Sequence, residues 1–270
     1  MSALIQDTWG QTQRWLVHLR RDRMSLVLGI LQPLILLTLV GPLLNHVVND
    51  AEALREQMRQ RFHTTDYLTF LFSGIAVFTI LVNSILGGIP IVFDRETGFM
   101  DKVLVAPVSR LSIVAARFLY VILYSLIQVG LISVVAVLLG VRPAAPLLAL
   151  VVLVGYGTLL CAGLSVLSLA FAFVFPHHSI FFAITGFLLT PLLVLSPTFV
   201  SLDVMPRYMA MVAWLNPMTH AIEPIRAAFF AQSASEWLTP ARGASALALL
   251  VFDALCFAFA VRTIRRRVEP

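Results

Sequence analysis

The sequence has little charge and almost no lysine. Asp, Glu, Lys and Arg make up 12% of its 270 residues, and hydrophobic residues make up 59%; in a soluble domain about a quarter of the residues are charged. Lys102 is the single lysine, and Asp101 precedes it. A P-loop needs Gly-Lys-Ser/Thr, because its backbone amides and lysine cradle the phosphates of a nucleotide. The chain has no such motif, so any work driven by ATP requires a partner.

Reactive and metal-binding side chains are also scarce. The two cysteines, Cys161 and Cys256, lie in apolar stretches, and we interpret them as small hydrophobic residues rather than as a disulfide. His177 and His178 are adjacent, so they face different directions, and they lack the further ligands that a metal ion needs. The sequence therefore predicts no metal site and no catalytic residue in this chain.

Long apolar stretches are what the sequence has in abundance. A helix needs about 20 apolar residues to cross the hydrocarbon core of a bilayer. Six stretches meet this length or come close to it: 24–44, 67–92, 118–139, 147–175, 180–201 and 245–261. Backbone polar groups in lipid must be paired within the segment, which favours helices over an open sheet. The sequence predicts an all-α integral membrane protein with six transmembrane helices, in a single transmembrane domain over residues 1–270.

The basic residues predict an orientation for these spans. Arg and Lys are denser in 1–23, 93–117 and 262–270 than in the segments that would lie on the other side of the membrane. Cytoplasmic loops carry such an excess of positive charge. Because an even number of spans returns the chain to its starting side, both termini are predicted to be cytoplasmic.

Two further regions are predicted to lie at the membrane surface. In residues 3–21, Trp9 and Trp15 fall on the apolar arc of a helix and Arg21 falls on the opposite arc, which is typical of a helix in the headgroup layer; a plain cytoplasmic helix is the alternative. Residues 206–230 contain two apolar runs that are each too short to span. They predict short re-entrant helices on the outer side, before the last span.

The densest run of charge between two spans lies just after residue 92. Its apolar residues Phe99, Met100, Val103 and Leu104 follow helical spacing and are flanked by Arg95, Glu96, Asp101 and Lys102. An apolar ridge of this kind can insert into a groove of another protein. An ordinary amphipathic loop helix is the alternative.

Asp253 is the only acidic or basic residue inside the predicted spans. Carboxylates within a membrane are costly and commonly mark a proton, ion or substrate pathway. Asp253 could take part in proton coupling, or it could have a structural role or line a substrate path. It could also stay neutral, pair with a polar group on a neighbouring helix, or extend its carboxylate toward the lipid headgroups, and the sequence leaves these alternatives open.

Two motifs, at their places among the six spans, resemble those of a known family. The first is Phe93-Asp94-Arg95-Glu96 with Gly98-Phe99 and Leu104-Val105-Ala106-Pro107 after the second span; the second is Leu215-Asn216-Pro217-Met218-Thr219-His220-Ala221 with Pro224 and Arg226 before the last. With the N-terminal amphipathic helix, they resemble the type-2 membrane subunits of ATP-binding-cassette (ABC) exporters, a family that includes the daunorubicin-resistance-type permeases.

The resemblance implies a coupling helix at 94–106 that docks on a separate cytosolic ABC ATPase. Its residues would be Arg95, Glu96, Gly98, Phe99, Met100, Lys102, Val103, Leu104 and Pro107. The chain would hold no cofactor itself, because ATP and Mg²⁺ would be bound by the ATPase. The other partners implied are a second permease chain, in a homodimer, and membrane lipids; no nucleic acid is expected.

The resemblance also implies a substrate path and an outer gate. The path would involve the second and fifth spans, through Phe78, Asn83, Ser84, Thr185 and Thr190, and we add Asp253 from the last span. The gate would be formed by the short outer helices, through Leu215, Asn216, Pro217, His220, Pro224 and Arg226.

The function implied is that of a permease subunit of an ABC exporter in the plasma (inner) membrane. It would move a hydrophobic or amphipathic substrate, such as a drug, lipid or glycolipid, outward, and it would not itself be an enzyme. A polysaccharide exporter and an ion-coupled secondary transporter that uses Asp253 are the alternatives, with a membrane enzyme or a scaffold further behind.

Overall fold

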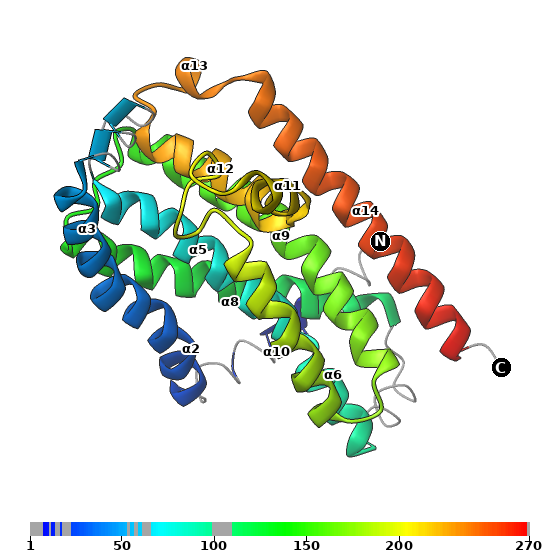
Figure 1. The fold of residues 1–270 in the computed structure, drawn as a ribbon. Coiled ribbons are helices and arrows are strands. Elements are labelled where there is room, and N and C mark those ends of the chain that lie inside the picture. The colour runs from blue at the N-terminus through cyan, green and yellow to red at the C-terminus, as the bar shows by residue number, and fades with distance from the viewer. Residues whose placement is uncertain are drawn as a thin grey trace.

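The computed structural model describes residues 8–10, 12–13, 17, 23–52, 55–56, 59–60, 66–98 and 110–268. Within these ranges all regular structure is helical, as predicted (Figure 1). The helices are α2 Arg23–Ile35, η1 Leu36–Val40, α3 Gly41–Asp50, α5 Tyr67–Leu86, α6 Ile89–Glu96, α8 Arg110–Leu138, α9 Pro146–Val174, α10 His178–Val194, α11 Arg207–Leu215, α12 Pro217–Phe230, α13 Ala234–Trp237 and α14 Pro240–Val268. A short π-helix, η1, joins α2 to α3.

Five of the described helical segments are long and apolar enough to cross a membrane. They are Leu26–Val48, Tyr67–Glu96, Ala115–Leu138, Pro146–Val174 and Pro240–Thr263, and they overlap five of the six predicted spans. The protein is therefore a multi-pass membrane protein, as the composition indicates.

The predicted span 180–201 differs from the helix that is found there. Helix α10 has 17 residues and ends at Val194, so it is about 25 Å long and shorter than a hydrocarbon core of about 30 Å. Pro191 lies in its last turn and Pro197 follows, and proline removes a helical donor. Five spans are found among the described residues, and the sixth stays a prediction.

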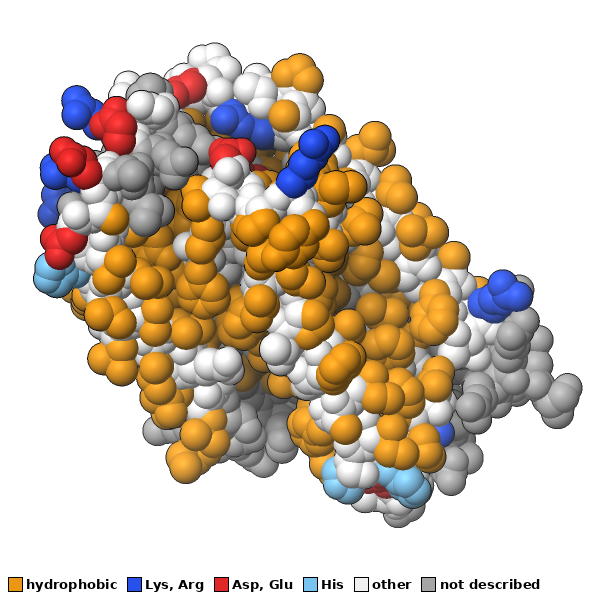
Figure 2. All heavy atoms as spheres, viewed as in Figure 1, with side chains coloured by type: hydrophobic (Ala, Val, Ile, Leu, Met, Phe, Trp, Pro, Cys, Tyr) orange, Lys and Arg blue, Asp and Glu red, His pale blue; other side chains and the backbone are white. Residues whose placement is uncertain are grey.

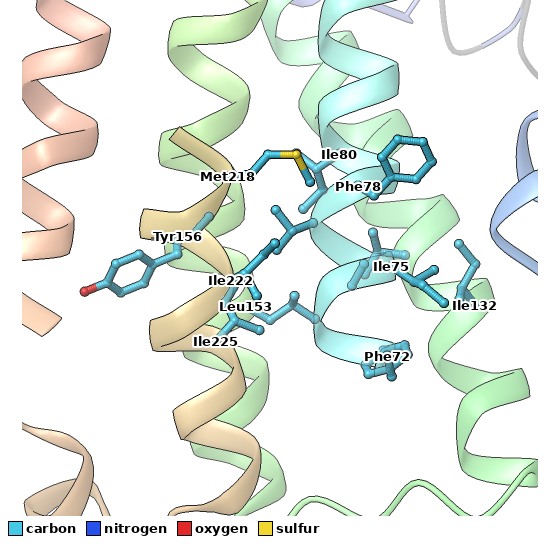
Figure 3. Close-up of a cluster of buried hydrophobic side chains, with 14 of the residues drawn as sticks. Phe72, Ile75, Phe78, Ile80, Ile132, Leu153, Tyr156, Met218, Ile222 and Ile225 are labelled. Carbon is cyan, nitrogen blue, oxygen red and sulfur yellow. The ribbon is translucent and has the colours of Figure 1, made fainter. Parts of the chain in front are cut away.

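Helix α5 is the centre of the bundle. Nearly all of its residues are buried, and it packs against α8, α9 and α12. Figure 3 shows α5 with Leu153 of α9 and Ile222 and Ile225 of α12 on one side and Ile132 of α8 on the other. Because α5 is hydrophobic on every side, its neighbours can cover it all round.

Other helices leave large apolar side chains uncovered. Figure 2 shows hydrophobic side chains across the middle of one face, with most acidic and basic side chains toward its upper end. On α14, Leu247, Leu250 and Leu255 are exposed, and on α10 Phe187 is 80% exposed. Apolar surfaces of this extent mark contact with lipid or with another protein.

The segments predicted to lie at the membrane surface are described only in part. Of residues 3–21, positions 8–10, 12–13 and 17 are described, and all are helical. The predicted outer helices 206–230 correspond to α11 and α12. Helix α12 is not a surface helix, however, because it packs among α5, α9 and α14; its re-entrant insertion stays a prediction.

Candidate functional site

Helices α5 and α6 meet at a tight junction that is hydrogen-bonded to α9. The backbone N–H of Gly88 donates to Ser168 Oγ at 2.8 Å, and that hydroxyl donates to the carbonyl of Ile85 at 2.5 Å. A Cβ atom on Gly88 would lie 2.6 Å from the carbonyl oxygen of Ser168, so only glycine allows this approach. Arg117 Nε donates to the carbonyl of Gly87 at 2.8 Å. The start of α6 is therefore held in place from two sides.

Arg95, in the last turn of α6, binds the end of α9. Its Nη1 donates to the carbonyl of Ala172, and it lies 3.4 Å from that of Phe175. The guanidinium also lies 5.8 Å from the centre of the Phe173 ring. The last carbonyls of a helix have no partner within it and carry partial negative charge, so a cation is stabilising there.

Glu96, the next residue, binds the start of α10. One carboxylate oxygen accepts from the backbone N–H of His178 at 2.7 Å, and the other lies 2.7 Å from Nδ1 of the same residue. His177 Nδ1 is 3.5 Å away, and the rings of Phe93 and His178 stack at 4.9 Å. An anion is stabilising at the N-terminus of a helix. Adjacent residues of α6 thus cap the end of α9 and the start of α10.

The predicted coupling helix 94–106 does not run continuously from its first residue. Helix α6 ends at Glu96, and Thr97 and Gly98 form a turn in which Gly98 has a φ of 68°. A positive φ favours glycine and interrupts a helix. The remaining predicted coupling residues lie outside the described part of the chain: Phe99, Met100, Lys102, Val103, Leu104 and Pro107.

A buried arginine organises the opposite end of the bundle, where α12 meets α5. Arg226 is 0% exposed and donates to Ser73 Oγ at 3.1 Å and to the carbonyl of Pro197 at 2.5 Å. Its Nη1 pairs with Glu223 at 3.2 Å, and its guanidinium lies 3.5 Å from the centre of the Phe70 ring. A buried charge is tolerated only when it is paired and hydrogen-bonded, and Arg226 meets both conditions.

Asn216 connects the end of α10 to the start of α12. Its side-chain NH₂ donates to the carbonyls of Leu192 and Leu195 at 2.7 and 2.8 Å, and its side-chain oxygen accepts from the backbone N–H of Met218 at 3.0 Å. Pro217 occupies the first position of α12, where its missing N–H costs nothing. One side chain therefore serves both as a cap for α12 and as a partner for the carbonyls of α10.

An open cavity of about 490 Å³ lies beside these outer helices. Segments from Leu202 to Ser245 line it, including Trp214, His220, Pro224 and Arg242. Sites for small molecules range from about 300 to 1,000 Å³. Of the other predicted gate residues, Leu215 is 85% exposed, and Pro217 and Arg226 do not line the cavity.

The comparisons with known proteins identify the family. A model of the ABC-2 type transporter family matches residues 7–230. The chain belongs to this family. It is 34% identical over 265 residues to a protein of Cyanophora paradoxa named "Putative transport permease ycf38". The aligned region covers 94% of this chain and 87% of that relative. Proteins of the same name from Porphyra purpurea and Pyropia yezoensis are 33% and 32% identical, over 87% and 83% of this chain and 76% and 74% of theirs.

ABC-2 permeases are not themselves enzymes, and they normally work with an ABC ATPase partner. Among the described residues no group of three or more His, Cys, Asp or Glu is placed to hold a metal ion.

The residues predicted for the substrate path of this ABC-2 permease are not gathered at one place. Phe78 is buried in the core, and Asn83 donates to Gln128 at 2.8 Å. Ser84 and Thr185 each donate to a carbonyl of their own helix, at 2.7 Å in both cases. Thr190 is exposed on α10 and lies 3.4 Å from the carbonyl of Gly186.

Asp253 lies on the face of α14 that meets α9. Its Oδ1 is buried and has no hydrogen-bond partner among the described residues. A Cβ atom on Gly163 would collide with that oxygen and lie 2.8 Å from the ring of Phe252. The small residue on α9 therefore makes room for the carboxyl group.

Helix α8 carries polar residues that the sequence analysis did not select. Gln128 is buried and donates to the hydroxyl of Tyr124 at 2.8 Å, in addition to its bond with Asn83. Arg117 is buried within the apolar segment Ala115–Leu138, so Asp253 is not the only charged residue in a span. The sequence contains a pattern that could have identified them, because Arg117, Tyr124 and Gln128 recur at helical spacing along one side of an apolar stretch.

Proposed function

We propose that this chain is the membrane subunit of an ATP-driven exporter. The observation that carries the proposal, together with the family, is the junction at which Arg95 and Glu96 bind the end of α9 and the start of α10. This junction lies at the start of the segment 94–106, which we propose as the coupling segment that docks on the ABC ATPase. ATP and Mg²⁺ are bound by that ATPase, and its movement reaches the permease through α6.

The proposed cargo is a hydrophobic or amphipathic molecule, such as a drug, a lipid or a glycolipid. The proposal is supported by the exposed apolar side chains of α10, among them Phe182, Phe187 and Val194. In a homodimer, this helix and α5 of both chains would border a path that is compatible with apolar groups. The outer end, with α11, α12 and the cavity beside them, would act as the gate. A polysaccharide cargo is the alternative within the same mechanism.

The proposed location is the plasma membrane, with both termini in the cytoplasm. In this orientation α6 and the start of α10 face the cytoplasm, and α13 lies at the opposite end of the bundle (Figure 1). Six spans, with α10 as the fifth, satisfy this arrangement.

The experiment that tests the proposal starts from the tagged chain, purified from its native membrane. We expect an ABC ATPase to co-purify in equal amount. Reconstituted together in liposomes, the two should hydrolyse ATP faster when a lipid-like or drug-like cargo is added, and the cargo should accumulate on one side. ATP hydrolysis by the purified permease alone, or the absence of any ABC ATPase from the complex, would contradict the proposal.

Ion-coupled transport is the second candidate, and one observation favours it. The Oδ1 atom of Asp253 is buried without a hydrogen-bond partner among the described residues, and such carboxyl groups can carry a proton across a membrane. The test is uptake by the permease alone in liposomes with a pH gradient. Uptake that is lost in Asp253→Asn supports this candidate, and transport that depends on the ATPase excludes it.

A further inference from the structure

The last turn of α6 contacts two helices that differ greatly in how firmly they are held. Helix α9, which Arg95 binds, packs extensively against α5, α12 and α14. Helix α10, which Glu96 binds, has its main contacts with α5 and α6, and Phe182, Phe187 and Val194 on it are exposed. A displacement of α6 would therefore move α10 more readily than α9.

The charges at this point match the helix ends that they touch. Arg95 binds the carbonyl end of α9, and Glu96 binds the N–H end of α10, so each residue opposes the partial charge of its helix terminus. Glu96 makes three contacts with the first residues of α10, two with His178 and one with His177. Its side chain is only 20% exposed. Glu96 thus faces the permease itself, whereas a docking residue would face the ATPase.

We propose that Glu96 is a positioning residue that transmits movement of the coupling segment to α10, while Arg95 keeps α6 anchored on α9. The inference rests on the proposed function, because it concerns how ATP hydrolysis reaches the membrane helices. It assigns different roles to two adjacent charges: Arg95 is the fixed point of α6, and Glu96 is its link to the helix that moves.

The first test replaces Glu96 with alanine in the full permease–ATPase complex. We expect cargo-stimulated ATP hydrolysis and cargo transport to fall by at least about fivefold, which is the lower range of coupling between sites in proteins. Binding of the ATPase and the Tm of the complex should stay as in the wild type, because α6 remains bound to α9 through Arg95.

The chain offers a matched control in Asp50→Ala. Asp50 and His46 also form a carboxylate–histidine pair, at 2.9 Å, but both lie on α3 and are largely exposed. Because this pair joins no two helices, its loss should leave stimulated hydrolysis unchanged.

A second test restores the link by other means. We expect Glu96→Cys and His178→Cys each to lose stimulation, and the double variant to regain it when a short thiol cross-linker joins the two positions. A change that merely destabilised the fold would not be reversed by a cross-link between α6 and α10. The existing cysteines, Cys161 and Cys256, are buried, which favours labelling of the introduced pair.

Three outcomes would overturn the inference. Glu96→Ala could retain full stimulation, it could lose ATPase binding together with stimulation, or the cross-linked double variant could stay uncoupled. Failure of the proposed function has a different signature, because the wild-type chain would then show no cargo-stimulated hydrolysis with an ABC ATPase at all.

Discussion

At the scale of single residues, several polar side chains of this permease hold helices together. Arg226 joins α12 to α5 and to the segment after α10, and Gln128 joins α8 to α5. In lipid, such bonds satisfy groups that would otherwise be unpaired in hydrocarbon. Sequence analysis selected Arg226 for the outer gate, but its pairing with Ser73 could not be predicted, because it depends on how two distant segments pack.

Arg226 provides the first prediction. Arg226→Met should lower the stability of the purified permease by about 3–5 kcal/mol, because Glu223 would lose this ion pair and two backbone carbonyls would lose a donor. Thermal unfolding in detergent is the measurement. Arg207→Met, at an exposed position of α11, is the control and should change little. Equal Tm values for the two variants would show that the buried network does not stabilise the fold.

Gly163 provides the second prediction. Gly163→Ala should destabilise the contact of α9 with α14 by about 1–3 kcal/mol, because its Cβ would collide with Asp253 and Phe252. Gly155→Ala is the matched control in the same helix, since a Cβ there meets nothing within 4 Å. Replacing Asp253 with alanine as well should recover part of the loss in a double-mutant cycle. Additive effects would argue against a direct contact between the two residues.

At the scale of elements, the ends of the helices carry the specific contacts, whereas their middles are apolar. The α5–α6 junction, the α9–α10 turn and the α10–α12 connection each depend on one or two side chains that bind backbone groups at a helix terminus. Such groups have no partner within their own helix. A change at these positions should therefore alter how helices are joined while leaving each helix intact.

Asn216 tests this at the outer end. Asn216→Ala removes the donor for two carbonyls at the end of α10 and the cap of α12, so we expect a loss of about 1–3 kcal/mol. Asn216→Asp keeps the acceptor for Met218 but turns an oxygen toward the two carbonyl oxygens in place of the NH₂ group, so it should be no more stable than the alanine variant. Hydrogen exchange at the start of α12 is the measurement, and unchanged exchange in both variants would contradict this role.

At the scale of the whole molecule, the two ends of the bundle differ in what they present. One end has the Arg95–Glu96 junction and the segment after it, and the other has α11 to α13 and the cavity of about 490 Å³. This polarity is what a permease needs if it is driven from one side and releases cargo on the other.

Accessibility labelling tests this polarity. In whole cells, a membrane-impermeant thiol reagent should label Ser235→Cys on α13 but not Thr97→Cys after α6, and the order should reverse in inside-out vesicles. Both native cysteines are buried, so their background should be low. Labelling of both positions from the same side would exclude α10 as a span. It would also contradict the proposal that the coupling segment and α13 lie on opposite sides of the membrane.

Composition and local patterns of residues are enough to establish the environment and the class of this protein. Its apolar stretches require lipid and helices, the missing Gly-Lys motif excludes a P-loop in this chain, and two short motifs indicated the ABC-2 family before any contact was known. These conclusions follow from composition and from patterns within one segment, where neighbours in sequence are also neighbours in space.

Which groups meet depends on how the helices pack. Packing brings Glu96 to the start of α10, Arg226 beside Ser73, and Asp253 against Gly163. Helices such as α9 and α10 are hydrophobic on nearly every side. Their sequences therefore have no polar face that would indicate which side of each helix faces its neighbours. The orientation of each helix about its axis and the helices that it contacts are set by packing between segments that lie far apart in the chain.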